Sequence, residues 1–263
     1  MKHRLSILLL FILSCGDVPE FEADNSFDPQ NPLYTPPSVT LKSGPQNNDI
    51  LTSSTTTFSW NGNLEGMFFR YFLDERLLQE WDAINSVVIN FLDEGSHRFS
   101  VQGKYPTGDV SDTVHVDFSV NAVDGPAILF FPRKQISVAG GNFSFDILAE
   151  EVDSLAAASF TLTFDPSFIE IDSVAVGQYI VDNLDSIFYN DFDNAAGTAT
   201  VITGLLGTNS PTFSGTASIA KIYGKVKSNG LSQIQFDGSE TFRSINNEII
   251  SINAAIGGVI DQE

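Results

Sequence analysis

Alternation between hydrophobic and polar positions dominates the chain from Ser38 onward. In the segment 98–102, Phe99 and Val101 alternate with polar neighbours, as in a β-strand with one wet face. No stretch carries a convincing helical pattern of apolar positions; the nearest, Leu73 to Trp81, is short. Gly, Asn, Asp and Pro divide the hydrophobic runs at short intervals, which is typical of β-sandwiches. The pattern predicts an all-β protein.

A first block of predicted strands covers residues 38–120. Trp60 ends its second strand and is expected between two sheets, facing Phe68–Phe72. The predicted strands are Ser38–Lys42, Thr55–Trp60, Met67–Leu73, Ser86–Leu92, His97–Lys104 and Thr113–Val120. Residues 121–126 contain Asp124-Gly125-Pro126 and read as a turn between domains.

A second block covers residues 127–263. In its strand 157–164, the two-residue period places Phe160 and Phe164 on the face that enters the core. The opposite set, which includes Ala157, Ser159 and Thr161, faces solvent or a partner. The predicted strands are Ala127–Phe131, Gln135–Val138, Asn142–Ala149, Ala157–Phe164, Ile169–Val174, Ser186–Asn190, Thr198–Thr203, Ser214–Val226, Gln233–Phe236 and Glu248–Ile252.

The N-terminus has the pattern of a targeting signal. Basic residues precede a short apolar run, Leu5–Leu13, and residues 12–15 (Ile-Leu-Ser-Cys) resemble the bacterial lipobox. This resemblance implies a signal peptide over 1–14 and lipidation of Cys15, with ordinary secretion as the alternative. The resemblance therefore predicts a lipid-anchored protein of the bacterial cell envelope, at the outer membrane or cell surface.

Residues 15–37 are rich in Pro, Asn and Asp and show no apolar period. Extended as polyproline, at about 3.1 Å per residue, they would reach roughly 70 Å from the lipid. We interpret them as a tether; the acidic residues after Cys15 are alternatively a sorting signal.

Composition narrows the choice of partners. The 263 residues include 13 Lys and Arg against 33 Asp and Glu, a formal net charge of −20. This balance argues against nucleic acid and against membrane contact other than through the lipid anchor. One Cys excludes an intrachain disulfide. A monomer is expected.

The first block resembles fibronectin type III and bacterial immunoglobulin-like modules. The residues that carry this likeness are Phe58-Ser59-Trp60, Phe69-Arg70-Tyr71-Phe72, Leu92-Asp93-Glu94-Gly95 and the run from His97 to Val101. The resemblance implies a spacer. The family often has Tyr at the position of His97, so the corner hydrogen bond is expected to be absent or made differently.

The second block resembles a cohesin domain. The matching stretches are 136–147, 160–171 with its Phe-Asp-Pro turn, 193–198 and 215–222. The resemblance implies a nine-stranded jelly-roll sandwich with one broad face that binds dockerin modules. Some carbohydrate-binding modules share this fold, so the fold alone does not choose the ligand.

The resemblance places the binding face at Ala157, Ser159, Thr161, Tyr189 and Leu205. Cohesins tend to present Asn or Asp outward on the first of these strands, where this chain has Ala157 and Ser159. The face is thus expected to be small and apolar. Either its partner differs from familiar dockerins or the face binds nothing.

No motif predicts catalysis, a cofactor or a metal. The three His residues show no ligand spacing, and nucleophile-elbow, P-loop and zinc-protease motifs are absent. Asp182, Asp185, Asp191 and Asp193 invite a calcium interpretation, but an EF-hand loop from Asp191 lacks Gly and Glu at its sixth and twelfth positions. A different calcium loop stays open beside the simpler interpretation of solubilising charge. We therefore expect a non-enzyme.

Three functions remain open from the sequence. The leading hypothesis is a surface lipoprotein that docks a dockerin-like protein, within a role in polysaccharide degradation. The alternatives are a polysaccharide-binding lipoprotein and a structural envelope protein without ligand. The absence of Trp from the second block weakens the sugar hypothesis, and only Trp81 in the first block has a polar setting.

Overall fold

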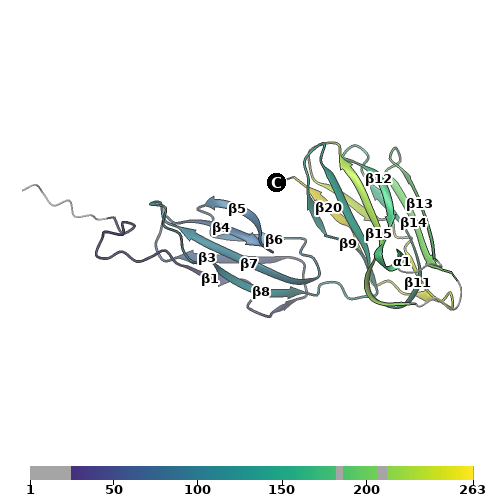
Figure 1. Cartoon of the computed structure of the whole chain (residues 1–263), viewed down its shortest axis with the longest axis horizontal. Coiled ribbons are helices and arrows are strands. Elements are labelled where there is room, and N and C mark those ends of the chain that lie inside the picture. Colours follow the sequence, from purple (N-terminus) through teal and green to yellow (C-terminus); the bar gives the residue numbers. More distant parts are fainter. Residues whose placement is uncertain (1–24, 182–185, 207–211, 263) are drawn as a thin grey trace, which may run out of the picture.

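The computed structural model describes residues 25–181, 186–206 and 212–262. The described chain is all-β apart from one helical turn, α1 (Gln178–Val181), and forms two β-sandwich domains along the long axis of the molecule (Figure 1). No helix among these residues has the length and apolar character needed to cross a bilayer. The predicted signal peptide and Cys15 lie outside the described residues.

The first domain packs a three-stranded sheet, in the order β1-β3-β6, on a five-stranded sheet, β2-β8-β7-β4-β5. The strands are β1 (Val39–Ser43), β2 (Ile50–Leu51), β3 (Thr56–Gly62), β4 (Phe68–Leu73), β5 (Arg76–Asp82), β6 (Ser86–Ile89), β7 (Gly95–Lys104) and β8 (Val114–Val120).

Aromatic rings fill the core of this domain. Trp60 is fully buried, with Phe69 and Tyr71 at 6.1 and 5.3 Å between ring centroids. The expectation that Phe68–Phe72 faces Trp60 therefore holds only for alternate residues, because successive side chains of β4 point to opposite faces.

Strand β5 occupies the segment in which the sequence showed its nearest approach to a helical pattern. Asp74 and Glu75 join β4 to β5, with φ of 50° and 67°. Positive φ at both central residues gives a two-residue hairpin turn whose twist matches the strands. The pairing with β4 thus overrides the local pattern.

Part of the predicted tether is attached to the first domain. The ring of Phe27 lies 4.9 Å from that of Tyr105, and the Tyr105 hydroxyl donates to the Thr35 carbonyl at 2.9 Å. The Asn63 side-chain amide donates to the Pro36 carbonyl at 3.1 Å. Residues 27–37 therefore pack against the first domain as an extension of it. Residues 15–24 of the predicted tether lie outside the described residues.

The second domain consists of strands that join one hydrogen-bonded network of twelve. The strands are β9 (Ala127–Phe131), β10 (Lys134–Ile136), β11 (Asn142–Phe164), β12 (Ile169–Val176), β13 (Ser186–Asp193), β14 (Thr198–Leu205), β15 (Phe213–Val226), β16 (Ser232–Phe236), β17 (Thr241–Ser244), β18 (Ile249–Ile250), β19 (Ala254–Ile256) and β20 (Gly258–Asp261).

Strand β11 connects the two layers of this sandwich and merges two predicted strands. Its first half pairs with β9 and β15, and its second half pairs with β14 and β17. Glu151 and Ser154, with φ of 47° and 56°, lie between the halves and break the regular register. The strand count exceeds the expected nine mainly because pieces of two to four residues, such as β18 and β19, are counted separately.

The inward face of β11 agrees with the prediction. Phe160 and Leu162 are fully buried and Phe164 is nearly so. Phe160 packs with its ring perpendicular to that of Phe236, at 5.8 Å between centroids. The opposite residues of the strand therefore face outward.

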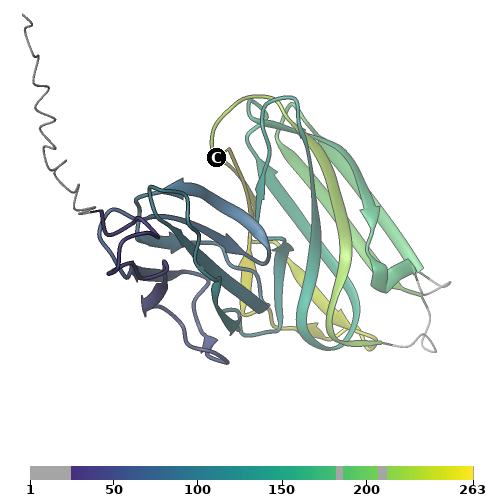
Figure 2. The ribbon, with the colours of Figure 1, turned by 60° about the vertical axis from the view of Figure 1, so that its left-hand side comes forward.

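The two domains touch through their connection. The backbone N–H of Arg133 donates to Oδ1 of Asp93 at 2.6 Å, and the Asn253 side chain donates to the Gly125 carbonyl at 2.7 Å. Strand β20, close to the end of the chain, lies on the side of the second domain that faces the first (Figures 1 and 2).

Candidate functional site

Four strands of the second domain, in the order β17-β11-β14-β13, form one continuous outer face. The hydrogen-bond register sets side chains from different strands in rows across this face. One row contains Thr241, Ser159, Ile202 and Tyr189. The neighbouring row contains Arg243, Ala157, Gly204 and Ile187, and the next contains Thr161, Thr200 and Asp191. We call this surface the docking face, after the binding that the sequence analysis expects here.

Large apolar side chains lie exposed at the β14-β13 side of the docking face. Ile187, Tyr189 and Ile202 are 45%, 55% and 40% exposed. They are adjacent in the register, so they make one patch. Scattered exposed apolar residues are ordinary, whereas a large contiguous apolar patch is typical of interaction surfaces.

Small residues lie beside this patch. A Cβ added at Gly204 would lie 3.2 Å from the Cβ of Ala157, so these two positions face the same way. Because neither has a long side chain, the surface between them is nearly level with the backbone. The hydroxyl oxygens of Thr161 and Thr200 are 3.1 Å apart and bond to each other. A partner can therefore approach the backbone closely along the centre of the face.

Four of the five residues predicted for the binding face come together here: Ala157, Ser159, Thr161 and Tyr189. The fifth, Leu205, does not belong with them. Leu205 pairs with Ser186. It is three positions from Ile202, and side chains an odd number of positions apart point to opposite faces of a strand, so Leu205 lies on the inward side of β14. The missing member is Ile202, and the alternation along residues 199–204 was the signal that marks it as outward.

Charge is confined to the margin of the docking face. Arg243 lies next to Ala157 and donates through its guanidinium to the Asn247 carbonyl at 3.0 Å. Asp191 lies at the opposite edge of the face, on β13, at the end of the row that contains Thr161 and Thr200. The face therefore has small, hydroxyl-bearing residues at its centre, an apolar patch at the β14-β13 side and charge at its rim.

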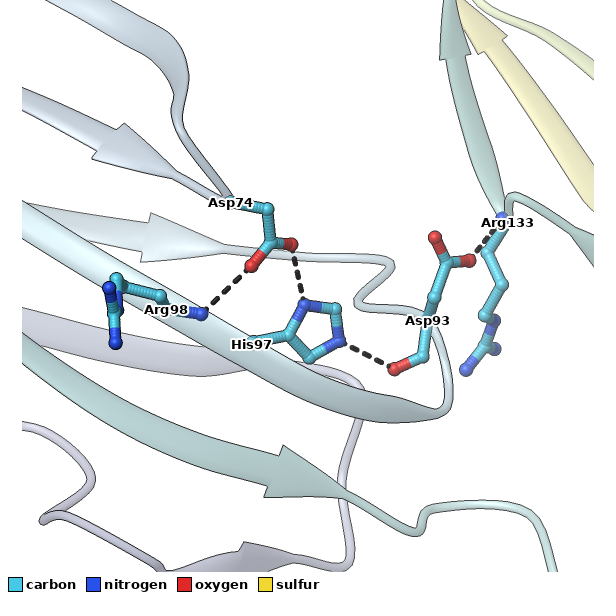
Figure 3. Close-up of polar contacts among 5 residues, drawn as sticks. All are labelled: Asp74, Asp93, His97, Arg98 and Arg133. Carbon is cyan, nitrogen blue, oxygen red and sulfur yellow. Dashed lines mark hydrogen bonds and ion pairs between the residues drawn. The ribbon is translucent and has the colours of Figure 1, made fainter.

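A second polar arrangement lies where the first domain meets the second (Figure 3). The ring of His97 is buried, with Nδ1 2.7 Å from Oδ2 of Asp74 and Nε2 2.8 Å from the Asp93 carbonyl oxygen. A carbonyl and a carboxylate both accept, so both ring nitrogens donate and the imidazole is positively charged. His97 thus ties Asp74, at the β4-β5 turn, to Asp93, in the segment before β7.

The pKa directions agree with this geometry. Burial alone would lower the pKa of His97, but the hydrogen bonds to Asp74 and Asp93 outweigh it and raise the pKa. Burial would raise the pKa of Asp74, and bonds from His97 and from the Arg98 backbone lower it instead. For Asp93, burial prevails and raises the pKa. Since His97 is engaged at both nitrogens, it holds the turn that contacts Arg133 and is not poised as a base.

The residues described contain no group of three or more His, Cys, Asp or Glu side chains that could hold a metal ion. Asp193 of the calcium hypothesis accepts from the backbone N–H groups of Ala195 and Ala196, at 2.8 and 3.1 Å, and so shapes a turn. Asp182 and Asp185 lie outside the described residues.

Comparison with known proteins concerns the second domain. Residues 133–260 match the family model of the cohesin domain. A search of curated proteins gives no match.

Solved structures similar to this chain include cohesins. A type II cohesin from the cellulosome of Acetivibrio cellulolyticus is 14% identical, over 51% of this chain and 94% of its own, with a TM-score of 0.46. A non-cellulosomal cohesin from the archaeon Archaeoglobus fulgidus is 15% identical, over 51% and 88%, with a TM-score of 0.42. The sixth cohesin of scaffoldin B from Acetivibrio cellulolyticus, solved with a Cel5 dockerin mutant, is 16% identical, over 53% and 100%, with a TM-score of 0.45.

The family match covers the strands that build the docking face and begins just after the junction with the first domain. The likeness to the cohesin family therefore lies in the second domain, at residues 133–260.

Proposed function

We propose that this chain is a non-catalytic lipoprotein of the bacterial cell envelope whose cohesin domain docks a protein partner. The observation that carries the proposal is the exposed patch of Ile187, Tyr189 and Ile202 beside the small residues of β11. Water contact with such a patch is unfavourable, and a partner that covers it gains about 25 cal/mol for each Å² of apolar area.

A dockerin-type module is the partner class that the cohesin match supports. The outward residues of β11 are small and mostly carry hydroxyls, so the partner can approach the backbone closely and hydrogen-bond to Ser159. Arg243 at the rim favours an acidic group on the partner at that side.

The lipid anchor rests on the sequence of residues 1–15, where a basic start and an apolar run precede Cys15. Acylation at Cys15 would place the first domain between the membrane and the cohesin domain. The first domain then acts as a spacer that carries the docking face away from the lipid.

The proposal is tested by titrating the full chain with dockerin modules and comparing Ser159→Arg with wild type. Ser159 lies at the centre of the docking face, so the variant buries an unpaired charge under the partner and costs at least about 2 kcal/mol, or thirtyfold in Kd. The matched control is Ser173→Arg on exposed β12, which pairs on the other side of the sandwich with β15.

We expect Ser173→Arg to bind as wild type does, and both variants to keep the wild-type melting temperature. An affinity that is indifferent to Ser159→Arg would move the contact away from this face. Failure of wild type to bind any dockerin module would contradict the partner class.

A further inference from the structure

A different surface, on the first domain, combines aromatic rings with positive charge. Strand β4 turns Phe69 and Tyr71 into the core and presents Phe68, Arg70 and Phe72 outward. Strand β7 sets Lys104 beside Phe68 and Gln102 beside Arg70 in the register, and β5 brings Trp81 to the same face. We call Phe68, Arg70, Phe72, Trp81 and Lys104 the aromatic-cationic face.

Both cations of this face lie against the same indole. Cζ of Arg70 is 4.7 Å and Nζ of Lys104 is 4.6 Å from the centroid of the Trp81 ring, and Arg70 is 5.5 Å from the ring of Phe72. Arg70 also donates through Nε and one terminal nitrogen to Oε1 of Gln102, at 2.9 and 2.7 Å. These contacts fix the positions of the charges without neutralising them, because neither a ring nor an amide carries negative charge.

Among the residues that the structure describes, Arg70 and Lys104 have no carboxylate partner. The ion pairs found within the described residues do not include Arg70 or Lys104. Arg98, on the same outer side of β7, is paired with Asp117 at 2.6 Å. In a chain with 33 acidic and 13 basic side chains, two adjacent unpaired cations leave a local site for negative charge.

The spacing along β4 defines the shape of the ligand. Ring, cation and ring follow each other at alternate residues, about 6.6 Å from Phe68 to Arg70 and again to Phe72. A flat sheet with this alternation suits an extended polymer in which rings and carboxylates alternate. Phe68, at 38% exposure, provides an apolar platform for the C–H face of a sugar ring.

We propose that the aromatic-cationic face binds an acidic polysaccharide of the polyuronate type. Uronate carboxylates lie against Arg70 and Lys104, and the sugar rings lie on Phe68 and along the edge of Trp81. The site is separate from the docking face, so the protein would hold a polymer with its first domain and a protein with its second.

The test is affinity electrophoresis of the full chain at low ionic strength, in gels that contain polygalacturonate, neutral dextran or poly-L-glutamate. Polygalacturonate should retard wild type, and dextran should not. Poly-L-glutamate carries the same charges without sugar rings and should retard the protein much less. Because the charges are exposed, retardation by polygalacturonate should weaken as salt is added.

Three variants locate the site. Arg70→Gln with Lys104→Gln should weaken binding about tenfold for each charge-assisted contact removed. Trp81→Leu keeps both cations but removes the ring that fixes them, and should also weaken binding. The matched control is Arg98→Gln, which removes a cation already engaged by Asp117 and should leave binding unchanged.

The proposal is overturned if polygalacturonate does not retard wild type. Equal retardation by poly-L-glutamate would overturn the sugar assignment in favour of an acidic polypeptide partner. A loss in Arg98→Gln as large as in the double variant would show that net charge, and not this face, governs binding. Far-UV circular dichroism melts of all variants, which alter exposed or half-buried side chains, exclude unfolding as the cause.

Discussion

Substitution of Phe160 by Ala should destabilise the second domain and leave the first domain unchanged. The side chain is fully buried, and its transfer out of water contributes about 1.5–3 kcal/mol. A residual cavity of roughly 100 Å³ adds about 2 kcal/mol at 24 cal/mol for each Å³. Loss of the perpendicular contact with Phe236 adds about 1 kcal/mol, so we expect a total of about 4.5–6 kcal/mol.

The distribution of Trp residues lets one experiment follow the two domains separately. Both Trp residues, Trp60 and Trp81, lie in the first domain, so Trp fluorescence during urea unfolding reports that domain alone. Far-UV circular dichroism reports both. With a urea dependence of about 2 kcal/mol/M, Phe160→Ala should lower the midpoint of the second domain's transition by about 2–3 M and leave the fluorescence midpoint in place.

Phe131→Ala is the matched control, because it removes the same side chain from the same domain at a position that is 42% exposed. Its cost should stay below about 1 kcal/mol. Equal costs for the two variants would refute the assignment of the inward face of β11, and with it the docking face on the opposite side. A fluorescence midpoint that shifts together with the dichroism would show that the domains unfold as one unit.

Three further predictions concern binding, pH and anchoring. Tyr189→Ala should raise the Kd of a docked partner about thirtyfold or more, because burial of roughly 100 Å² of its exposed ring contributes about 2.5 kcal/mol. Tyr223 is the control: it is also a tyrosine and is 39% exposed, but it lies on the other side of the sandwich. Tyr223→Ala should leave the Kd unchanged in the same titration. Because the pKa of His97 is raised in the folded protein, its protonation stabilises the fold fully below the unfolded pKa of about 6.5, and this stabilisation is lost as pH rises through the folded pKa. The urea midpoint followed by Trp fluorescence should therefore fall with rising pH in wild type. In His97→Gln the midpoint should not change over that pH range. Cys15→Ala should move the protein from the membrane fraction to the soluble one, and an unacylated wild type in mass spectrometry would contradict the anchor.

The hydrophobic pattern was sufficient for the fold class and for most strands. A two-residue period states which side chains share a face, so the burial of Phe160 and the outward direction of Ser159 followed from residues 157–164 alone. It did not yield β5, because Leu73 to Trp81 lacks clean alternation and becomes a strand only through pairing with β4. The short strand β2 was missed for the same reason, since it is held by β8.

The composition of each surface was decided by the tertiary structure. Which strands lie side by side depends on pairings between residues far apart in the chain, and these pairings set Ile202 and Tyr189 beside Ser159 and exclude Leu205. The same holds for Arg70 and Lys104, which are separated by 34 positions in the numbering and meet over Trp81. Local alternation specifies the direction of a side chain relative to its own strand, whereas its neighbours are fixed by the register between strands, which the long-range packing of the core selects.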